Sequence, residues 1–267
     1  MTIMEPLEIG ILSKRNKGFT GKIKRYYEKK GHSVKIFLEG NLSIDNSLLE
    51  KDFYILKSKQ LFYLYAAYFL DSNNVIVIPD TYISHIFKNR VESYFSLQKK
   101  GFLTPKVYMG NAKSFKSQLS INEFPLVQKP IMSSGSKDIR IIKSINDLDL
   151  NSEEVIYLEK YIEGNHYLVY FIENETCVCE KKPLANEHQK VKIITNDYEI
   201  EQLTLQWKEI YKLMFGHLDL IRERSTNKLY IVDVGTFPEF SNWKGSIDPI
   251  KAIGDSILFK YQLLKGN

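Results

Sequence analysis

Two acidic residues, Asp219 and Asp233, each interrupt an apolar run typical of a β-strand. A polar segment, residues 222–228, separates the two runs, and its composition predicts a hairpin turn that would bring the acids side by side. Buried carboxylates need a partner, and Mg²⁺ typically uses one or two carboxylates together with substrate phosphates. The pair therefore predicts a magnesium site, with two unrelated strand acids near solvent as the alternative.

A second stretch has the composition of a hairpin that covers phosphates. Residues 124–129 form a predicted strand that ends at Lys129, and residues 139–142 form its return strand. Between them lie Ser134, Gly135 and Ser136, whose small side chains allow backbone N–H groups to approach phosphate oxygens. The stretch lacks the pattern GxxxxGK[ST], so it is not a Walker A loop, and an ordinary flexible hairpin is the competing interpretation.

The first 85 residues alternate predicted strands with predicted helices, a pattern typical of a parallel sheet in a small α/β domain. No GxGxxG sequence follows the first strand, so the dinucleotide-binding fingerprint is absent. The expected strands cover residues 7–12, 34–38, 53–56 and 75–78, and the expected helices cover residues 18–30 and 60–70.

The rest of the chain supplies the elements that must hold the acids and the hairpin in place. Helical periodicity and strand-like apolar runs alternate here without a regular βαβ order. We expect helices at residues 89–100, 202–215 and 248–264, a strand at 155–158, and a hairpin of residues 167–172 and 176–179.

Composition limits the classes of protein to consider. The chain has 267 residues, of which 43% are hydrophobic, which is enough for a sizeable core. A net charge of +5 suits anionic ligands such as nucleotides but does not indicate nucleic acid as a partner. The longest apolar run, residues 61–70, is too short to span a bilayer, so we expect a soluble, cytoplasmic protein. Cys177 and Cys179 are expected to pack as small hydrophobic residues.

Three stretches, in this order, resemble motifs of the ATP-grasp superfamily. Residues 129–136 (KPIMSSGS) resemble its KPxxGSxG hairpin, and residues 158–162 (LEKYI) resemble the hinge that reads adenine. Residues 232–242 (VDVGTFPEFSN) are similar to the EVNHxxEFxN stretch of LysX-type enzymes. The chain most resembles the RimK-type and LysX-type carboxylate–amine ligases. The resemblance implies an α/β fold with an N-terminal α/β domain (residues 1–85), a small ATP-grasp lobe (86–160) and a C-terminal lobe with the metal site (161–267).

The same resemblance assigns ATP and Mg²⁺ as cofactors and gives roles to individual residues. Arg90 and Lys129 would hold the ATP phosphates under the hairpin of Ser134, Gly135 and Ser136. Asp219 and Asp233 would bind Mg²⁺, and Lys129 and Lys182 are the candidate catalytic residues. The residues expected to face adenine and ribose are Glu159, Lys160, Tyr161, Ile162 and Glu163.

The chain also departs from the family pattern. Gly235 replaces the asparagine that follows the second acid, so one metal ligand is missing, and restoring asparagine there should preserve activity if only a ligand was lost. The DxR pair expected after the hinge is absent around residues 166–169, and NxxxGG is absent from residues 184–192. His85, His166 and His188 lack the spacing of metal ligands, and we expect them at the surface or in the core.

The resemblance implies an ADP-forming ligase, in which ATP phosphorylates a carboxylate and an amine attacks the acyl phosphate. The sequence has no Ser-His-Asp or Cys-His signature. This absence agrees with a ligase, because such chemistry needs positioning and charge neutralisation more than a protein nucleophile. Two alternatives remain: a small-molecule kinase of the inositol-phosphate type, whose DINxFPGY stretch also resembles residues 233–240, and a degenerate ATP-binding protein. The expected partners are a small-molecule or peptide substrate carrying a carboxylate or an amine, with an acidic carrier peptide as a further candidate. No nucleic acid or membrane partner is expected, and homo-oligomer formation stays open.

Overall fold

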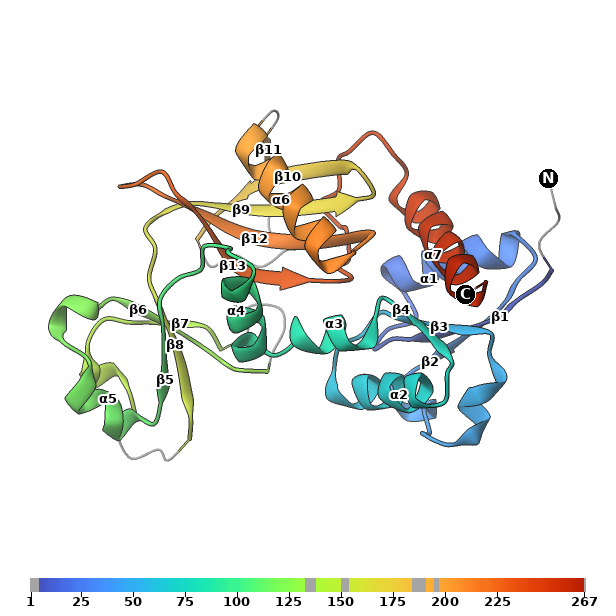
Figure 1. The fold of residues 1–267 in the computed structure, drawn as a ribbon, viewed down its shortest axis with the longest axis horizontal. Helices are drawn as coiled ribbons and strands as arrows, with labels where there is room; N and C mark the ends of the chain where they lie inside the picture. The colour runs from blue at the N-terminus through green and yellow to red at the C-terminus, as the bar shows by residue number, and fades with distance from the viewer. Residues whose placement is uncertain (1–4, 133–137, 150–153, 184–190, 195–196, 267) are drawn as a thin grey trace.

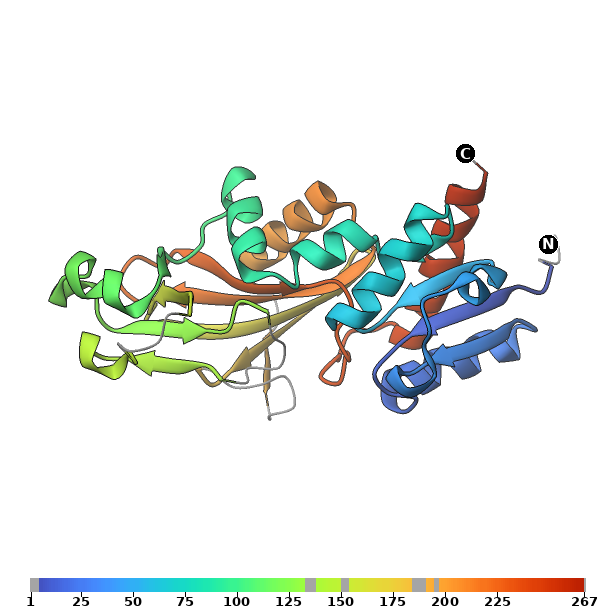
Figure 2. The same ribbon diagram turned by 90° about the horizontal axis from the view of Figure 1, so that it is seen from below.

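The structure is a computed structural model that describes residues 5–132, 138–149, 154–183, 191–194 and 197–266. The described strands form three sheets that follow one another along an elongated molecule (Figures 1 and 2). The observed sheets and the helices that pack on them agree with the predicted α/β fold class.

The first sheet is parallel, with strand order β2-β1-β3-β4, and helices cover both of its faces. Ile9, Ile11 and Phe53 point to the face that packs against α1 and α7, whereas Tyr54 and Leu56 point to α2. Strand alternation between the two faces explains why these strands are apolar throughout. The elements are β1 (Glu8–Leu12), α1 (Gly18–Lys29), β2 (Ser33–Phe37), β3 (Phe53–Leu56), α2 (Leu61–Ser72), β4 (Ile76–Ile78) and α7 (Pro249–Lys265), with short 3₁₀ helices at Glu39–Asn41 and Asn46–Glu50.

The C-terminal helix α7 returns to this first sheet, although it comes from the segment that the sequence assigned to the C-terminal lobe. Ile253, Ile257 and Tyr261 recur at helical spacing and are buried against the sheet, where the ring of Tyr261 stacks on Phe53 at 4.7 Å. The last residues of the chain therefore stabilise the N-terminal domain.

The second sheet is antiparallel, with order β5-β8-β6-β7, and it carries the expected hairpin. Its core is small and is closed by α5 through Phe115. Two helices, α3 and α4, lead from the first sheet to it. The elements are α3 (Thr81–Ile86), α4 (Arg90–Lys99), β5 (Val107–Gly110), α5 (Ala112–Gln118), β6 (Leu126–Lys129), β7 (Arg140–Ile142) and β8 (Ile156–Lys160), with 3₁₀ helices at Ile121–Glu123 and Ile145–Asp147.

The third sheet has order β11-β10-β9-β12-β13 and is antiparallel throughout. One face packs against α3, α4 and α6 around the buried Trp207, and the other shares a continuous core with the first sheet through Phe215, Phe237 and Phe240. This shared core fixes the first sheet against one end of the third. The elements are β9 (Gly164–Ile172), β10 (Glu175–Lys181), β11 (Lys192–Ile194), α6 (Tyr198–Tyr211), β12 (Phe215–Glu223) and β13 (Leu229–Gly235).

The helix expected at residues 202–215 is displaced towards the N-terminus. Asp197 caps it by accepting a hydrogen bond from the backbone N–H of Ile200, so the helix begins at Tyr198. It ends at Tyr211 because Lys212 adopts a left-handed conformation, which leaves Phe215 free to begin β12.

Cys177 and Cys179 are buried free thiols with their sulfurs 3.9 Å apart, as expected for residues on one face of a strand. No helix in the described part of the chain is long and apolar enough to cross a membrane.

Candidate active site

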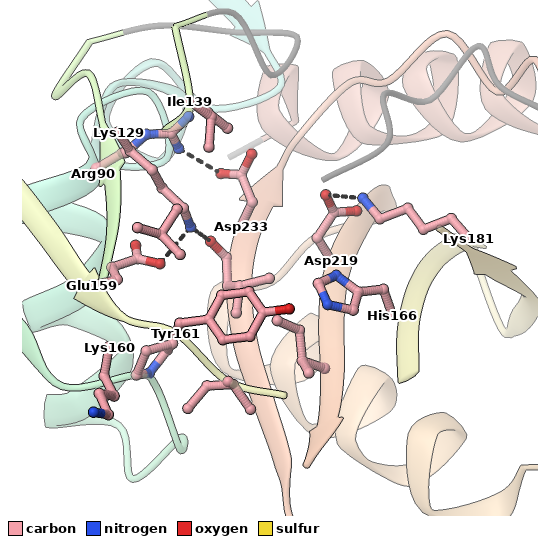
Figure 3. Close-up of a pocket in the computed structure, with 15 residues that line it drawn as sticks. Arg90, Lys129, Ile139, Glu159, Lys160, Tyr161, His166, Lys181, Asp219 and Asp233 are labelled. Carbon is pink, nitrogen blue, oxygen red and sulfur yellow. Dashed lines mark hydrogen bonds and ion pairs between the residues drawn. The ribbon is translucent and has the colours of Figure 1, made fainter. Parts of the chain in front are cut away.

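A pocket lies where the second and third sheets meet, and most of the predicted site residues line it (Figure 3). β6 and β8 supply one wall, and β9, β10, β12 and β13 supply the other. Strand alternation puts His166, Lys181, Asp219 and Ile221 on the same face of the third sheet, facing the second. The predicted residues in the lining are Arg90, Lys129, Glu159, Lys160, Tyr161, Ile162, Asp219 and Asp233.

Asp219 and Asp233 are cross-strand partners in the register of β12 and β13, as the hairpin prediction required. A bulge follows immediately, because Leu220 pairs with Ile231 and leaves Val232 as the extra residue. Lys129 donates a hydrogen bond to the carbonyl of Val232 at 3.1 Å, so the bulge links the paired acids to the base of the hairpin.

Each acid is bound to a cation of its own (Figure 3). The Nζ of Lys181 lies 2.6 Å from Oδ2 of Asp219, and Nη1 of Arg90 lies 3.4 Å from Oδ1 of Asp233. The other oxygen of Asp219, Oδ1, is buried and has no hydrogen-bond partner in the described part of the chain. Burying a carboxylate oxygen without a partner costs free energy, so this oxygen is suited to bind a cation.

The acids fit Mg²⁺ only if phosphate oxygens complete its coordination. Among the described residues, no cluster of three or more His, Cys, Asp or Glu side chains could hold a metal ion. Two carboxylates supplemented by substrate phosphates are a usual magnesium environment. The donor set of Asp219 and Asp233 therefore suits a metal that arrives with a nucleotide.

Positive charge dominates the surroundings of Asp233. Burial by itself raises the pKa of this carboxyl group, but Arg90, Lys129, His217 and Lys59 together hold the pKa below its ordinary value. Asp233 is therefore ionised at neutral pH, as a metal ligand must be.

Lys129 and Glu159 form a buried ion pair at 2.5 Å, and each side chain is only 8% exposed. Arg90 binds the same region, because its backbone N–H donates to the carbonyl of Ile131 at 3.0 Å and its Nε donates to that of Pro130 at 2.9 Å. Both cations thus lie at the base of the predicted phosphate-covering hairpin. The residues predicted for the hairpin tip, Ser134, Gly135 and Ser136, lie outside the described residues.

The hinge residues divide between the pocket and the outside. Tyr161 and Ile162 line the pocket, and the backbone N–H of Tyr161 is held by the carbonyl of Pro125 at 3.2 Å. The ammonium of Lys160 points away and donates to the carbonyl of Glu123 at 2.7 Å. Hydrogen bonds to main-chain carbonyls therefore fix the hinge, and the side chains of Tyr161 and Ile162 face the cavity.

Two predicted residues are not brought into the lining. Glu163 is exposed and pairs with Arg224 at 2.6 Å. Lys182 is exposed beyond the end of β10, whereas its neighbour Lys181 reaches the pocket and binds Asp219. The structure thus brings Lys181, and not Lys182, to the site.

His166 also lines the pocket, although the sequence indicated only a surface or core histidine. Its side chain is buried, and its Nε2 has no hydrogen-bond partner among the described residues. Burial, reinforced by the charge of Lys181, lowers the pKa of His166 to about 4, so the imidazole is neutral at pH 7. Its position opposite Lys181 and Ile221 follows from strand register, which no local sequence pattern revealed.

Gly235 is held by close packing rather than by an unusual backbone conformation. The described glycines with positive φ are Gly18, Gly31 and Gly101. A Cβ built on Gly235 would lie only 2.2 Å from Cε1 of His217, its partner across β12. Asparagine at position 235 would therefore require the His217 side chain to move, so Gly235 is more than a lost ligand.

A family model described as an ATP-grasp domain matches residues 87–234, and no curated protein matches the chain. Among solved structures, a RimK domain ATP-grasp protein from Sphaerobacter thermophilus DSM 20745 is similar, with a TM-score of 0.72 at 10% identity over 88% of this chain and 93% of that one. A RiPP-associated ATP-grasp ligase from Chryseobacterium gregarium, in complex with ADP and a leader and core peptide, has a TM-score of 0.69 at 14% identity over 95% and 97%. D-alanine–D-alanine ligase from Bacillus anthracis has a TM-score of 0.63 at 15% identity over 97% and 95%. The ATP-grasp fold predicted from the three motifs is confirmed, and the chain belongs to the ATP-grasp family.

Proposed function

We propose that this protein is an ADP-forming carboxylate–amine ligase that acts through an acyl phosphate. The observation that carries the proposal is the pair Asp219 and Asp233, facing each other at the end of a pocket whose other walls present Lys129 and Arg90. Acids that bind a metal and cations that bind phosphates are the two requirements of phosphoryl transfer from ATP.

The nucleotide would lie along the wall formed by the hinge. Tyr161 and Ile162 offer an apolar surface to adenine, and the triphosphate would extend towards Lys129 and Arg90. Asp219 and Asp233 would hold Mg²⁺, which when bound neutralises negative charge on the phosphates. The unpartnered Oδ1 of Asp219 is the protein atom best suited to that ion.

In the proposed reaction, a carboxylate oxygen of the acid attacks the γ-phosphorus of ATP. A new P–O bond forms as the bond to the β,γ-bridging oxygen breaks, and ADP leaves. An amine then attacks the acyl carbon, the C–O bond to phosphate breaks, inorganic phosphate leaves, and the amine nitrogen loses a proton. Lys129 and Arg90 stabilise the transferred phosphoryl group by charge.

The side chains in the lining suit this direct transfer. None of the described lining residues is a serine, threonine or cysteine, so the described walls offer no aliphatic hydroxyl and no thiol nucleophile for a covalent enzyme intermediate. Two of the structurally similar ligases were solved with peptides, which supports a peptide as the substrate that carries the carboxylate.

A hydroxylamine trap tests the proposal. The protein is incubated with Mg-ATP, hydroxylamine and a panel of carboxylic acids that includes acidic peptides, and hydroxamate and ADP are measured together. An acyl phosphate yields one hydroxamate per ADP. A stable phosphate ester with a polyol, and no hydroxamate from any acid, would instead establish the kinase alternative.

Binding of the nucleotide is tested separately by thermal unfolding. A ligand that binds only the folded state stabilises it by RT ln(1 + [L]/Kd), which is roughly 2.7 kcal/mol at 100 times Kd. A folded protein with no change in unfolding temperature in Mg-ATP would exclude the proposed nucleotide site.

A further inference from the structure

Beside the paired acids lie residues that the ligase proposal does not use. His217 and Gly235 are cross-strand partners on β12 and β13, two residues before Asp219 and two after Asp233. The imidazole of His217 fills the space beside Gly235, since a Cβ there would lie 2.2 Å from Cε1 and 2.8 Å from Nδ1. Residue 235 must therefore be glycine for His217 to take this position.

The first sheet contributes a third residue to this place. The Nζ of Lys59 would lie 3.1 Å from the same Cβ, so the ammonium and the imidazole converge on one point. Lys59 follows β3 at the carboxyl end of a parallel sheet, the edge where open α/β sheets bind ligands.

The loop that carries Lys59 is firmly attached. The Nζ of Lys57 lies 2.9 Å from Oε1 of Glu239 and donates to the carbonyls of Phe237 and Pro238 at 3.2 and 3.3 Å. On its other side, the backbone N–H groups of Lys57 and Ser58 donate to the carbonyl of Leu12 at 3.0 Å. Lys59 is thereby held between the first sheet and the segment that follows β13.

We propose that Lys59 and His217 form a phosphate subsite beside the paired acids, completed by the N-terminal domain. A lysine ammonium and an imidazole N–H are hydrogen-bond donors that suit an oxyanion. The proposal rests on the ligase function, because the phosphate in question is the group that ATP loses during turnover. It extends that function by assigning Lys59 and His217 to phosphate binding. Gly235 is needed because a side chain there would displace His217.

Inorganic phosphate is the probe for this subsite. Thermal unfolding is followed during phosphate titration at saturating Mg-ADP, and again without nucleotide, with chloride at equal ionic strength as the reference. We expect saturable stabilisation by phosphate in the wild type and an apparent Kd for phosphate at least tenfold higher in Lys59→Met and His217→Gln. Lys113→Met, which removes an exposed lysine from α5, should leave the titration unchanged. Acetate replaces phosphate in a parallel titration to probe a carboxylate site.

Failure of this proposal can be distinguished from failure of the ligase function. If Mg-ADP stabilises the wild type but phosphate does not, or if both variants keep the wild-type Kd for phosphate, the subsite is wrong while the nucleotide site stands. If Mg-ADP has no effect, the nucleotide site is wrong, and the titration without nucleotide still decides the subsite. Saturation by acetate but not phosphate would also overturn the proposal. The exchange variant His217→Gly/Gly235→Asn, which removes the steric conflict, should lose the phosphate response and retain that to Mg-ADP.

Discussion

Asp219 and Asp233 face each other across β12 and β13, yet Asp219 is paired with Lys181 at 2.6 Å and Asp233 with Arg90 at 3.4 Å. Two carboxylates this close would repel each other strongly without those cations. A metal ion with a nucleotide can take over the same task, since the phosphates would then attract Arg90 and Lys181. On the proposed function, the pocket would exchange these internal ion pairs for contacts with Mg-ATP.

Removing either acid should abolish turnover. Asp233→Asn and Asp219→Asn exchange a carboxylate for an amide, a poorer magnesium ligand, while keeping the shape of the side chain. Loss of several kcal/mol of charge stabilisation predicts a decrease in kcat of about 10²-fold or more. ADP release at saturating Mg-ATP measures the effect, and an unchanged circular dichroism spectrum verifies the fold. Near-normal turnover in both variants would remove the metal assignment.

Adjacent lysines should differ in importance. Lys181→Met leaves Asp219 partly buried without its counter-ion, and we expect turnover to fall at least about tenfold. Lys182→Met removes an exposed ammonium that does not line the pocket, and turnover should stay close to wild type. Steady-state ADP release compares the two, and a larger loss in Lys182→Met would return the catalytic role to the residue that the sequence indicated.

The buried pair of Lys129 and Glu159 should show non-additive stability. Lys129→Met leaves an unpaired carboxylate in the protein interior and is expected to cost ~3–5 kcal/mol of unfolding free energy. Lys129→Met/Glu159→Gln removes that charge as well and should recover part of the loss. Urea unfolding of both single variants and the double variant gives the coupling energy. Additive effects would mean that the ion pair contributes nothing.

Stability should decrease below pH 6.5 because of His166. Its pKa is lowered to about 4 in the folded protein, so between these values the unfolded chain binds more protons and unfolding becomes easier as the pH falls. The expected loss from pH 7 to pH 5 is about 2 kcal/mol. His166→Gln should flatten the dependence of the unfolding free energy on pH over this window. Equal slopes in wild type and His166→Gln would contradict the assignment.

The hairpin of the two acids was predictable because its information is local. Two apolar runs and a polar turn of suitable length specify the pairing, and the period of two then places Asp219 and Asp233 on one face. The order of the motifs was also predictable, because the hinge and the strand that ends at Lys129 can each be identified from a short stretch of sequence.

Long-range contacts explain what was missed. β9 begins at Gly164 rather than at residue 167, because a Cβ at Gly164 would lie 1.9 Å from the carbonyl oxygen of Arg222 and only glycine permits this approach. His166 therefore lies within the sheet. The ion pair between Glu163 and Arg224 and the packing of His217 against Gly235 join residues from separate elements, so no local pattern could predict them.

The transfer of oxygen from the acid to phosphate tests the ligase assignment most directly. The acid identified by the hydroxylamine trap is labelled with ¹⁸O in its carboxylate and incubated with Mg-ATP, the amine and the wild-type protein, and the released phosphate is analysed by mass spectrometry. Attack of the carboxylate on the γ-phosphorus predicts one ¹⁸O atom in each phosphate formed. Unlabelled phosphate, or a phosphate group retained on a hydroxyl of the acceptor, would contradict the acyl-phosphate mechanism.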